Sequence, residues 1–193
     1  MWREILPGLR IKLFMTVLLG VAYPLVMTAI SQVLFPHKSN GSLIVRDNKV
    51  IGSELIGQAF TRAEYLQPRP SSAGESGYDA TASNGSNYGP TNQKLVDRVK
   101  ASIEKFRKEN PEYSGPLPAD LVTSSASGLD PHVSPDSAQA QAARIAKARG
   151  APVDEIRRLI EQSTEQPDLG FLGEPRVNVL KLNLELDRVF PRR

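Results

Sequence analysis

The sequence contains no cysteine and only two histidines. The lack of cysteine excludes disulfides, thiolate nucleophiles and cysteine-bound zinc. Histidines and carboxylates nowhere cluster with the spacing of metal ligands, so no metal site is predicted. The phosphate-binding pattern GxxxxGK[ST] and the nucleophile pattern GxSxG are also missing. The sequence therefore lacks the usual signs of a nucleotide hydrolase and of a serine hydrolase.

The chain also has little net charge. The chain has 24 basic and 21 acidic residues, and Arg3, Arg10 and Lys12 near its start, against Glu4 alone, account for most of the excess. The rest has no basic stripe of the kind that a phosphate backbone requires, so nucleic acid is not an expected partner. With 40% hydrophobic and 23% charged residues, one packed domain plus a short extra segment is expected.

One long apolar run lies near the N-terminus. Residues 13–35, LFMTVLLGVAYPLVMTAISQVLF, carry no charge. As a helix the run would be about 35 Å long, enough to cross a hydrocarbon core of roughly 30 Å, and a bilayer tolerates Pro24. We predict a transmembrane helix over 13–35 with residues 1–12 in the cytoplasm, because basic residues flank that side. Residues 36–193 should then lie outside the cytoplasm, in a periplasm or its equivalent.

Two other interpretations of this run are weaker. A buried core helix would be unusually long and apolar on every face. A cleavable signal peptide finds a small-x-small site at 29–31, but the apolar run continues to Phe35, which favours an uncleaved anchor. Within the run, Thr16 and Gly20 form a small-xxx-small pair that could let a partner helix approach.

The pattern after the run is that of an α+β domain. Asp47-Asn48 between apolar stretches predicts a hairpin over 42–51. Helical spacing predicts helices after Asn92, between Ser134 and Gly150, and after Pro152. Their apolar faces are made of Leu95, Val96, Val99, Ile103, Phe106, Ala138, Ala142, Ile145, Ala146, Val153, Ile156, Leu159 and Ile160.

Residues 180–188 fit both a strand and a helix. Leucine at 180, 182, 184 and 186 alternates as in a strand, whereas Val179, Leu182, Leu186 and Val189 share a helical face. Because Leu, Lys and Glu are helix formers, we predict a short extended segment and then a helix capped by Asn178. The fold expected is one compact extracytoplasmic domain with a small sheet and three to four helices.

The segment 68–92 is rich in Gly, Pro, Ser, Asn and Thr. Long loops in compact domains tend to be binding loops or disordered. Arg69, Tyr78 and Tyr88 favour a binding surface, because arginine and tyrosine are enriched at interfaces. The turn at 84–89 also precedes a helix, whose N-terminus favours anions, but a lone glycine-rich turn is weak evidence for a nucleotide.

The residue types of a Ser-His-Asp site occur around His132. Asp130 lies beside it, and Ser125, Ser127 and Ser134 lie near it. Adjacent loop residues rarely reach the geometry of a triad, so we interpret them as turns and a helix cap. No catalytic residue is predicted.

Longer stretches that match a known protein family run in order through almost the whole chain. They are the apolar span that ends at Pro36 with NGSL at 40–43 after it, GSELIGQAF at 52–60, RPS at 69–71, SNGSNYGPTN at 83–92, DLVTSSASGLDPHVSP at 120–135, AKARG at 146–150 and RVNVLKLNLELD at 176–187. With these stretches the chain resembles the C subunits (KdpC) of the Kdp-type, ATP-driven potassium transport complexes of bacteria.

This resemblance implies a complex of four proteins: a channel-like subunit that binds potassium, a P-type ATPase subunit, a very small peptide subunit and this chain. It implies that this chain is a non-catalytic subunit that supports assembly and activity. It also implies that the chain acts as a catalytic chaperone, which raises the affinity of the ATPase subunit for ATP. ATP and potassium then belong to the complex as a whole. A stand-alone, membrane-anchored periplasmic binding or sensor protein is the alternative.

The resemblance also directs attention to particular loop residues. Direct contact with ATP would fall on the polar loops 83–92 and 123–130, at Ser83, Gly85, Ser86, Asn87, Ser127 and Gly128. An extracytoplasmic domain argues against such contact, because ATP is scarce there, and favours an indirect role in assembly. Contacts with partner subunits are expected from Tyr88, Asn87, Arg69 and Tyr78.

Overall fold

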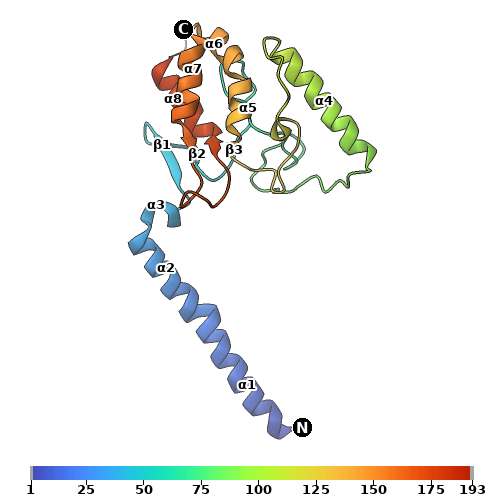
Figure 1. Cartoon of the computed structure of the whole chain (residues 1–193). Helices are drawn as coiled ribbons and strands as arrows, with labels where there is room; N and C mark the ends of the chain where they lie inside the picture. Colours follow the sequence, from blue (N-terminus) through green and yellow to red (C-terminus); the bar gives the residue numbers. More distant parts are fainter. Residues whose placement is uncertain (1, 192–193) are drawn as a thin grey trace. The chain divides into compact units, whose positions relative to one another are not determined.

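The computed structural model of the chain describes residues 2–191, and the chain divides after Ile51 into two compact units (Figure 1). The first unit holds α1 (Trp2–Val17), the π-helical turn η1 (Leu18–Ala22), α2 (Tyr23–Leu34), α3 (Pro36–Ser39), β1 (Leu43–Arg46) and the start of β2 (Lys49–Ser53). We call the second unit, from Gly52 onward, the domain. The division thus falls within β2.

One continuous helix, Arg3–Leu34, is long and apolar enough to cross a membrane, and it is the one such helix in the described part of the chain. Its large apolar side chains are exposed. The turn η1 interrupts the α-helical pattern just before Pro24, which has no N–H to donate. The Tyr23 N–H bonds to the Leu18 carbonyl, as in a π-turn. The helix therefore accommodates the proline by a local change of register.

The predicted small-residue pair lies on this helix one turn apart. A β-carbon on Gly20 would lie 3.9 Å from Cγ2 of Thr16, so the glycine leaves a shallow place on the helix surface. After the helix, β1 and β2 form the predicted hairpin. Its turn residues Asp47 and Asn48 have φ of 51° and 58°, the left-handed pair that a two-residue hairpin turn requires.

The domain has a three-stranded antiparallel sheet in the order β3-β5-β4. The strands are β3 (His132–Val133), β4 (Thr164–Glu165) and β5 (Arg176–Asn178), with Val177 opposite both Val133 and Thr164. The core beside this sheet is formed by Leu66, Val133, Ala138, Ala142, Ile145, Ala146, Ile156, Leu159, Ile160, Val177, Val179, Leu182 and Leu186.

Five α-helices lie in the described residues of the domain, more than the three to four expected. They are α4 (Gln93–Glu109), α5 (Pro135–Ala140), α6 (Ala142–Arg149), α7 (Val153–Gln162) and α8 (Val179–Val189). The helix predicted between Ser134 and Gly150 is divided at Gln141, whose buried side chain bonds to the N–H and the carbonyl of Gln67. Asn178 caps α8 by accepting from the Lys181 N–H, as predicted.

Segments far apart in the sequence are joined by buried polar side chains. Asn183 on α8 binds both the N–H and the carbonyl of Leu66, at 2.8 and 2.9 Å. The Tyr65 hydroxyl donates to Asp187 at 2.9 Å. The loop before α4 is thereby fixed to α8. Phe106 of α4 packs in a second, smaller cluster with Leu121, Val122 and Ala140. This cluster joins α4 to the 3-10 turn Ala119–Leu121.

Candidate partner-binding site

The loop 68–92 has no regular secondary structure but is ordered by hydrogen bonds. Ser71 lies at its centre: its hydroxyl donates to the Gly128 carbonyl at 2.6 Å and accepts from the Tyr78 N–H at 2.8 Å. The Tyr78 hydroxyl donates to the Arg69 carbonyl at 2.7 Å. The loop therefore closes on itself and on the second polar loop, 123–130.

Small residues allow the two loops to touch. Gly128 has φ +69°, and a β-carbon there would lie 2.6 Å from the Asn84 carbonyl oxygen. A β-carbon on Gly85 would lie 2.7 Å from the Ala126 carbonyl oxygen. The Ser127 carbonyl accepts from the Asn84 N–H and from the Ser83 hydroxyl, both at 3.0 Å. The Ser86 hydroxyl accepts from the Ser124 hydroxyl at 3.5 Å, so five of the six residues considered for ATP contact the opposite loop.

Arg69 and Tyr78 are both built into this packing. Arg69 donates to the Asp130 carboxylate at 2.8 Å, and their side chains are only 23% and 26% exposed. Burial alone would raise the pKa of Asp130, but hydrogen bonds from His132 and Arg69 outweigh it and hold the pKa below its usual value. Burial, with the nearby charge of Asp130, raises the pKa of Tyr78. The side chains of Arg69 and Tyr78 therefore both stabilise the loop.

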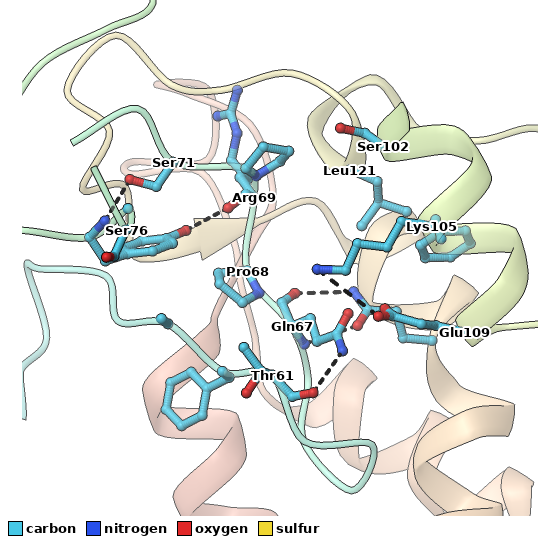
Figure 2. A pocket seen from close by; sticks show the side chains of 17 residues that line it. Thr61, Gln67, Pro68, Arg69, Ser71, Ser76, Ser102, Lys105, Glu109 and Leu121 are labelled. Carbon is cyan, nitrogen blue, oxygen red and sulfur yellow. Dashed lines mark hydrogen bonds and ion pairs between the residues drawn. The ribbon is translucent and has the colours of Figure 1, made fainter. Parts of the chain in front are cut away.

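A cleft of about 240 Å³ lies between this loop and α4 (Figure 2). Arg69, Gln67 and Ser71 line one side, while Lys105 and Glu109 come from α4. Lys105 Nζ lies 4.0 Å from a Glu109 carboxylate oxygen, and the Gln67 side-chain amide donates to the Thr61 carbonyl at 3.5 Å. The charged groups of the α4 wall therefore neutralise one another, and the cleft does not concentrate charge of one sign.

A separate cluster forms where Arg98 of α4 meets the loops. Its guanidinium donates to the hydroxyls of Ser72 at 3.0 Å and of Ser86 and Ser124 at 3.1 Å. It also lies 5.5 Å from the centre of the Tyr88 ring, in a cation–π contact. Its hydrogen-bond partners are three neutral hydroxyls from the two polar loops, so Arg98 holds the loops together and none of these partners neutralises its charge.

Sequence reasoning missed Arg98. Its position on the predicted helix could have indicated its role, because it lies three residues after Leu95 and beside Val99, at the edge of the apolar face. A long side chain there lies along the domain surface rather than extending into solvent. Tyr88, which Arg98 supports, is 38% exposed, and Asn87 beside it is exposed with φ +50°. These two predicted contact residues face outward.

The serine, histidine and aspartate residues do not assemble into a triad. His132 Nδ1 lies 3.6 Å from Asp130, but the Ser134 hydroxyl donates to Asp120 at 3.1 Å. The hydroxyls of Ser125 and Ser127 accept from backbone N–H groups of their own loop. Within residues 2–191, no group of three or more His, Asp or Glu side chains is placed to hold a metal ion.

The chain matches the family model described as "K+-transporting ATPase, c chain" (KdpC) over residues 5–188. Potassium-transporting ATPase KdpC subunits are among its relatives. That of Nitratidesulfovibrio vulgaris is 54% identical over 180 residues, covering 93% of this chain and 91% of the relative. That of Myxococcus xanthus is 53% identical over 192 residues (98% and 90%), and that of Rhodospirillum rubrum 54% over 191 (99% and 98%). The chain therefore belongs to the KdpC family, as the sequence motifs indicated.

Proposed function

We propose that the chain is a non-catalytic accessory subunit of an ATP-driven potassium uptake complex. The observation that carries this proposal is the family match, which extends over residues 5–188 and thus includes both the apolar helix and the domain. The partners are a channel-like potassium-binding subunit, a P-type ATPase subunit and a small peptide subunit. Potassium binding and ATP hydrolysis reside on those other subunits.

The proposed arrangement places the N-terminus in the cytoplasm and the domain in the periplasm. Arg3, Arg10 and Lys12 lie at the start of the helix, and basic residues favour the cytoplasmic side. The helix anchors the chain in the inner membrane, where Gly20 and Thr16 offer a place for a neighbouring helix to approach.

Residues 83–92, which we call the Tyr88 loop, are the proposed docking surface for the channel-like subunit. Tyr88 and Asn87 are exposed, and the guanidinium of Arg98 lies against the Tyr88 ring. A tyrosine buries much area at low entropic cost when it is already positioned. The retained positive charge of Arg98 adds attraction to a carboxylate or carbonyl on the partner surface.

An effect on the ATP affinity of the ATPase subunit is proposed to be indirect. Ser83, Gly85, Ser127 and Gly128 are engaged between the two loops, and a periplasmic domain meets little ATP. Docking instead stabilises the assembled form of the membrane subunits. If that form binds ATP more tightly, docking of this chain and ATP binding to the ATPase subunit strengthen one another by thermodynamic linkage, without direct contact between this chain and ATP.

The test is recovery of the complex from detergent with a tag on the full-length chain. Tyr88→Ala should weaken association by about 1–3 kcal/mol, as loss of an interface aromatic does, while the melting temperature of the chain stays the same. Tyr88→Phe keeps the ring over Arg98 and serves as the matched control, which should recover the complex normally. Unchanged recovery and unchanged potassium-stimulated ATPase activity in Tyr88→Ala with Asn87→Ala would reject this loop as the docking surface.

A further inference from the structure

A narrow hairpin tip lies between β4 and β5. Asp168 and Leu172 pair across it as an antiparallel bridge, with N–H to carbonyl bonds of 2.9 Å in both directions. The tip between them carries Leu169 and Phe171, which are 82% and 75% exposed, and Leu172 is 51% exposed. Three large apolar side chains are thus presented together on an ordered turn.

Leu169 contributes little to the domain that carries it. Its φ is +56°, a left-handed conformation that disfavours a leucine relative to glycine or asparagine. Its side chain is also too exposed to pack in the core. A glycine would relieve the backbone and remove an apolar group from water. The leucine is therefore explained better by something that it contacts outside the domain.

The base of this hairpin is fixed to the point where the chain enters the domain. Lys181 Nζ lies 3.3 Å from Glu165 on β4 and 2.6 Å from Glu54, just after β2. The Asn178 side chain at the end of β5 donates to the Glu54 carbonyl at 2.8 Å. The base of the hairpin is therefore held at the segment by which the chain enters the domain.

Carboxylates accompany the apolar tip. Asp168 is 74% exposed in its side chain and Glu174 is exposed. Arg176 orients this acidic edge, because its guanidinium lies 3.1 Å from Glu165 and 3.9 Å from Asp168. A surface complementary to this tip is apolar at its centre and basic at its rim.

We propose that Leu169, Phe171 and Leu172 insert into an apolar pocket with a basic rim on the extracytoplasmic face of a membrane-embedded subunit of the same ATPase. This inference rests on the proposed function, and it adds a second docking surface to the Tyr88 loop. A bilayer fits the tip less well. Lipid accepts apolar side chains in any arrangement and so gives no reason to hold Leu169 left-handed.

The test compares complexes assembled with full-length variants of this chain. Phe171→Ser removes the central aromatic group, and Leu169→Gly removes an apolar side chain while relieving the backbone. Each should raise the rate at which the subunit dissociates from the detergent-solubilised complex by about tenfold. The melting temperature should be unchanged for Phe171→Ser and unchanged or higher for Leu169→Gly. Val189→Ser, at the C-terminal end of α8 and 40% exposed, is the control and should dissociate like the unmodified chain.

A photo-reactive phenylalanine at position 171 identifies the occupant. Cross-linking to a membrane-embedded subunit supports the proposal, whereas cross-linking to lipid alone overturns it and assigns the tip to the bilayer. Dissociation rates of both variants equal to that of the unmodified chain also overturn it, even though the proposed function then stands. If the unmodified chain recovers no membrane subunit at all, the proposed function fails and the hairpin proposal fails with it.

Discussion

The guanidinium of Arg69 lies 2.8 Å from the carboxylate of Asp130 and joins the two polar loops of the domain. The same carboxylate accepts from the His132 N–H at 3.0 Å. One acidic side chain therefore fixes both the start of the loop 68–92 and the entrance to β3. The positions of Tyr78 and of the Tyr88 loop depend on this link, because all of them belong to one hydrogen-bonded unit.

Asp130 should make the stability of the chain fall at acid pH. Its pKa in the folded state lies below its usual value, so its contribution is present above the unfolded-state pKa of about 3.9 and is lost as pH falls through the lower folded-state pKa. Asp130→Asn should lower the free energy of unfolding at pH 7 by about 1–2 kcal/mol and should lessen the loss on acidification. Urea unfolding at pH 7 and pH 3 measures both, with Glu75→Gln in the same loop as a control that leaves the curves unchanged.

Gly128 should tolerate no side chain. Gly128→Ala combines a φ of +69° with a β-carbon 2.6 Å from the Asn84 carbonyl oxygen and 2.7 Å from the Ala73 nitrogen. Gly150 has a similar φ of +65° but nothing within 4 Å of its β-carbon position. Gly150→Ala should therefore cost only the left-handed conformation, about 1–2 kcal/mol, and Gly128→Ala clearly more. Equal losses in thermal unfolding would show that the two loops are not closely packed.

Arg144 should be required for folding of the domain. Its guanidinium donates to Asn110, to the Ala63 and Tyr65 carbonyls and to Gln141 from a buried position. Burial lowers its pKa to about 10, so it remains charged at neutral pH. Arg144→Met leaves these acceptors unsatisfied and should cost about 3–5 kcal/mol. Lys147→Met on the same helix removes only an exposed pair with Glu112 and should leave the denaturation midpoint in place.

The orientation of the chain can be measured directly. A reporter that is active only in the periplasm, fused after residue 193, should be active, because the basic residues precede the apolar helix. The mass of the mature chain should include Met1 or begin just after it. A mature chain beginning at Gln32 would show instead that the apolar segment is a cleaved signal peptide, and the proposed anchor would be wrong.

Local signals in the sequence predicted the helices well. Asn92, Ser134 and Asn178 each accept a hydrogen bond from the first turn of a helix, and a cap is legible from neighbouring residues alone. Asp47-Asn48 likewise predicted its hairpin. These features depend on interactions between residues only a few positions apart.

The sheet of the domain could not be predicted in the same way. Strands of two or three residues are too short to show an alternating pattern. The tip around Leu169 also escaped prediction, because its hairpin depends on a sheet that the sequence does not reveal.

The interlocking of the polar loops was equally hidden. Loop composition predicted a binding surface, but Ser71 reaches Gly128 and Arg98 reaches Ser124 through contacts that no local pattern encodes. The structure adds that Arg69 and Tyr78 serve the packing of the loop, whereas Tyr88 remains exposed.

The pairing of Leu66 with Asn183 sets the order in which the chain becomes native. The N–H and carbonyl of Leu66 bond to Asn183 on α8, which is synthesised more than a hundred residues later. The Tyr65 hydroxyl likewise bonds to Asp187 on the same helix. Contacts of such long sequence separation form slowly and late. In the proposed topology, the segment before α4 therefore lacks its native partners during export, and folding of the domain is completed only after α8 has left the translocation channel. A chain arrested before α8 emerges should remain sensitive to protease and dependent on holding chaperones, however much of the domain has already crossed.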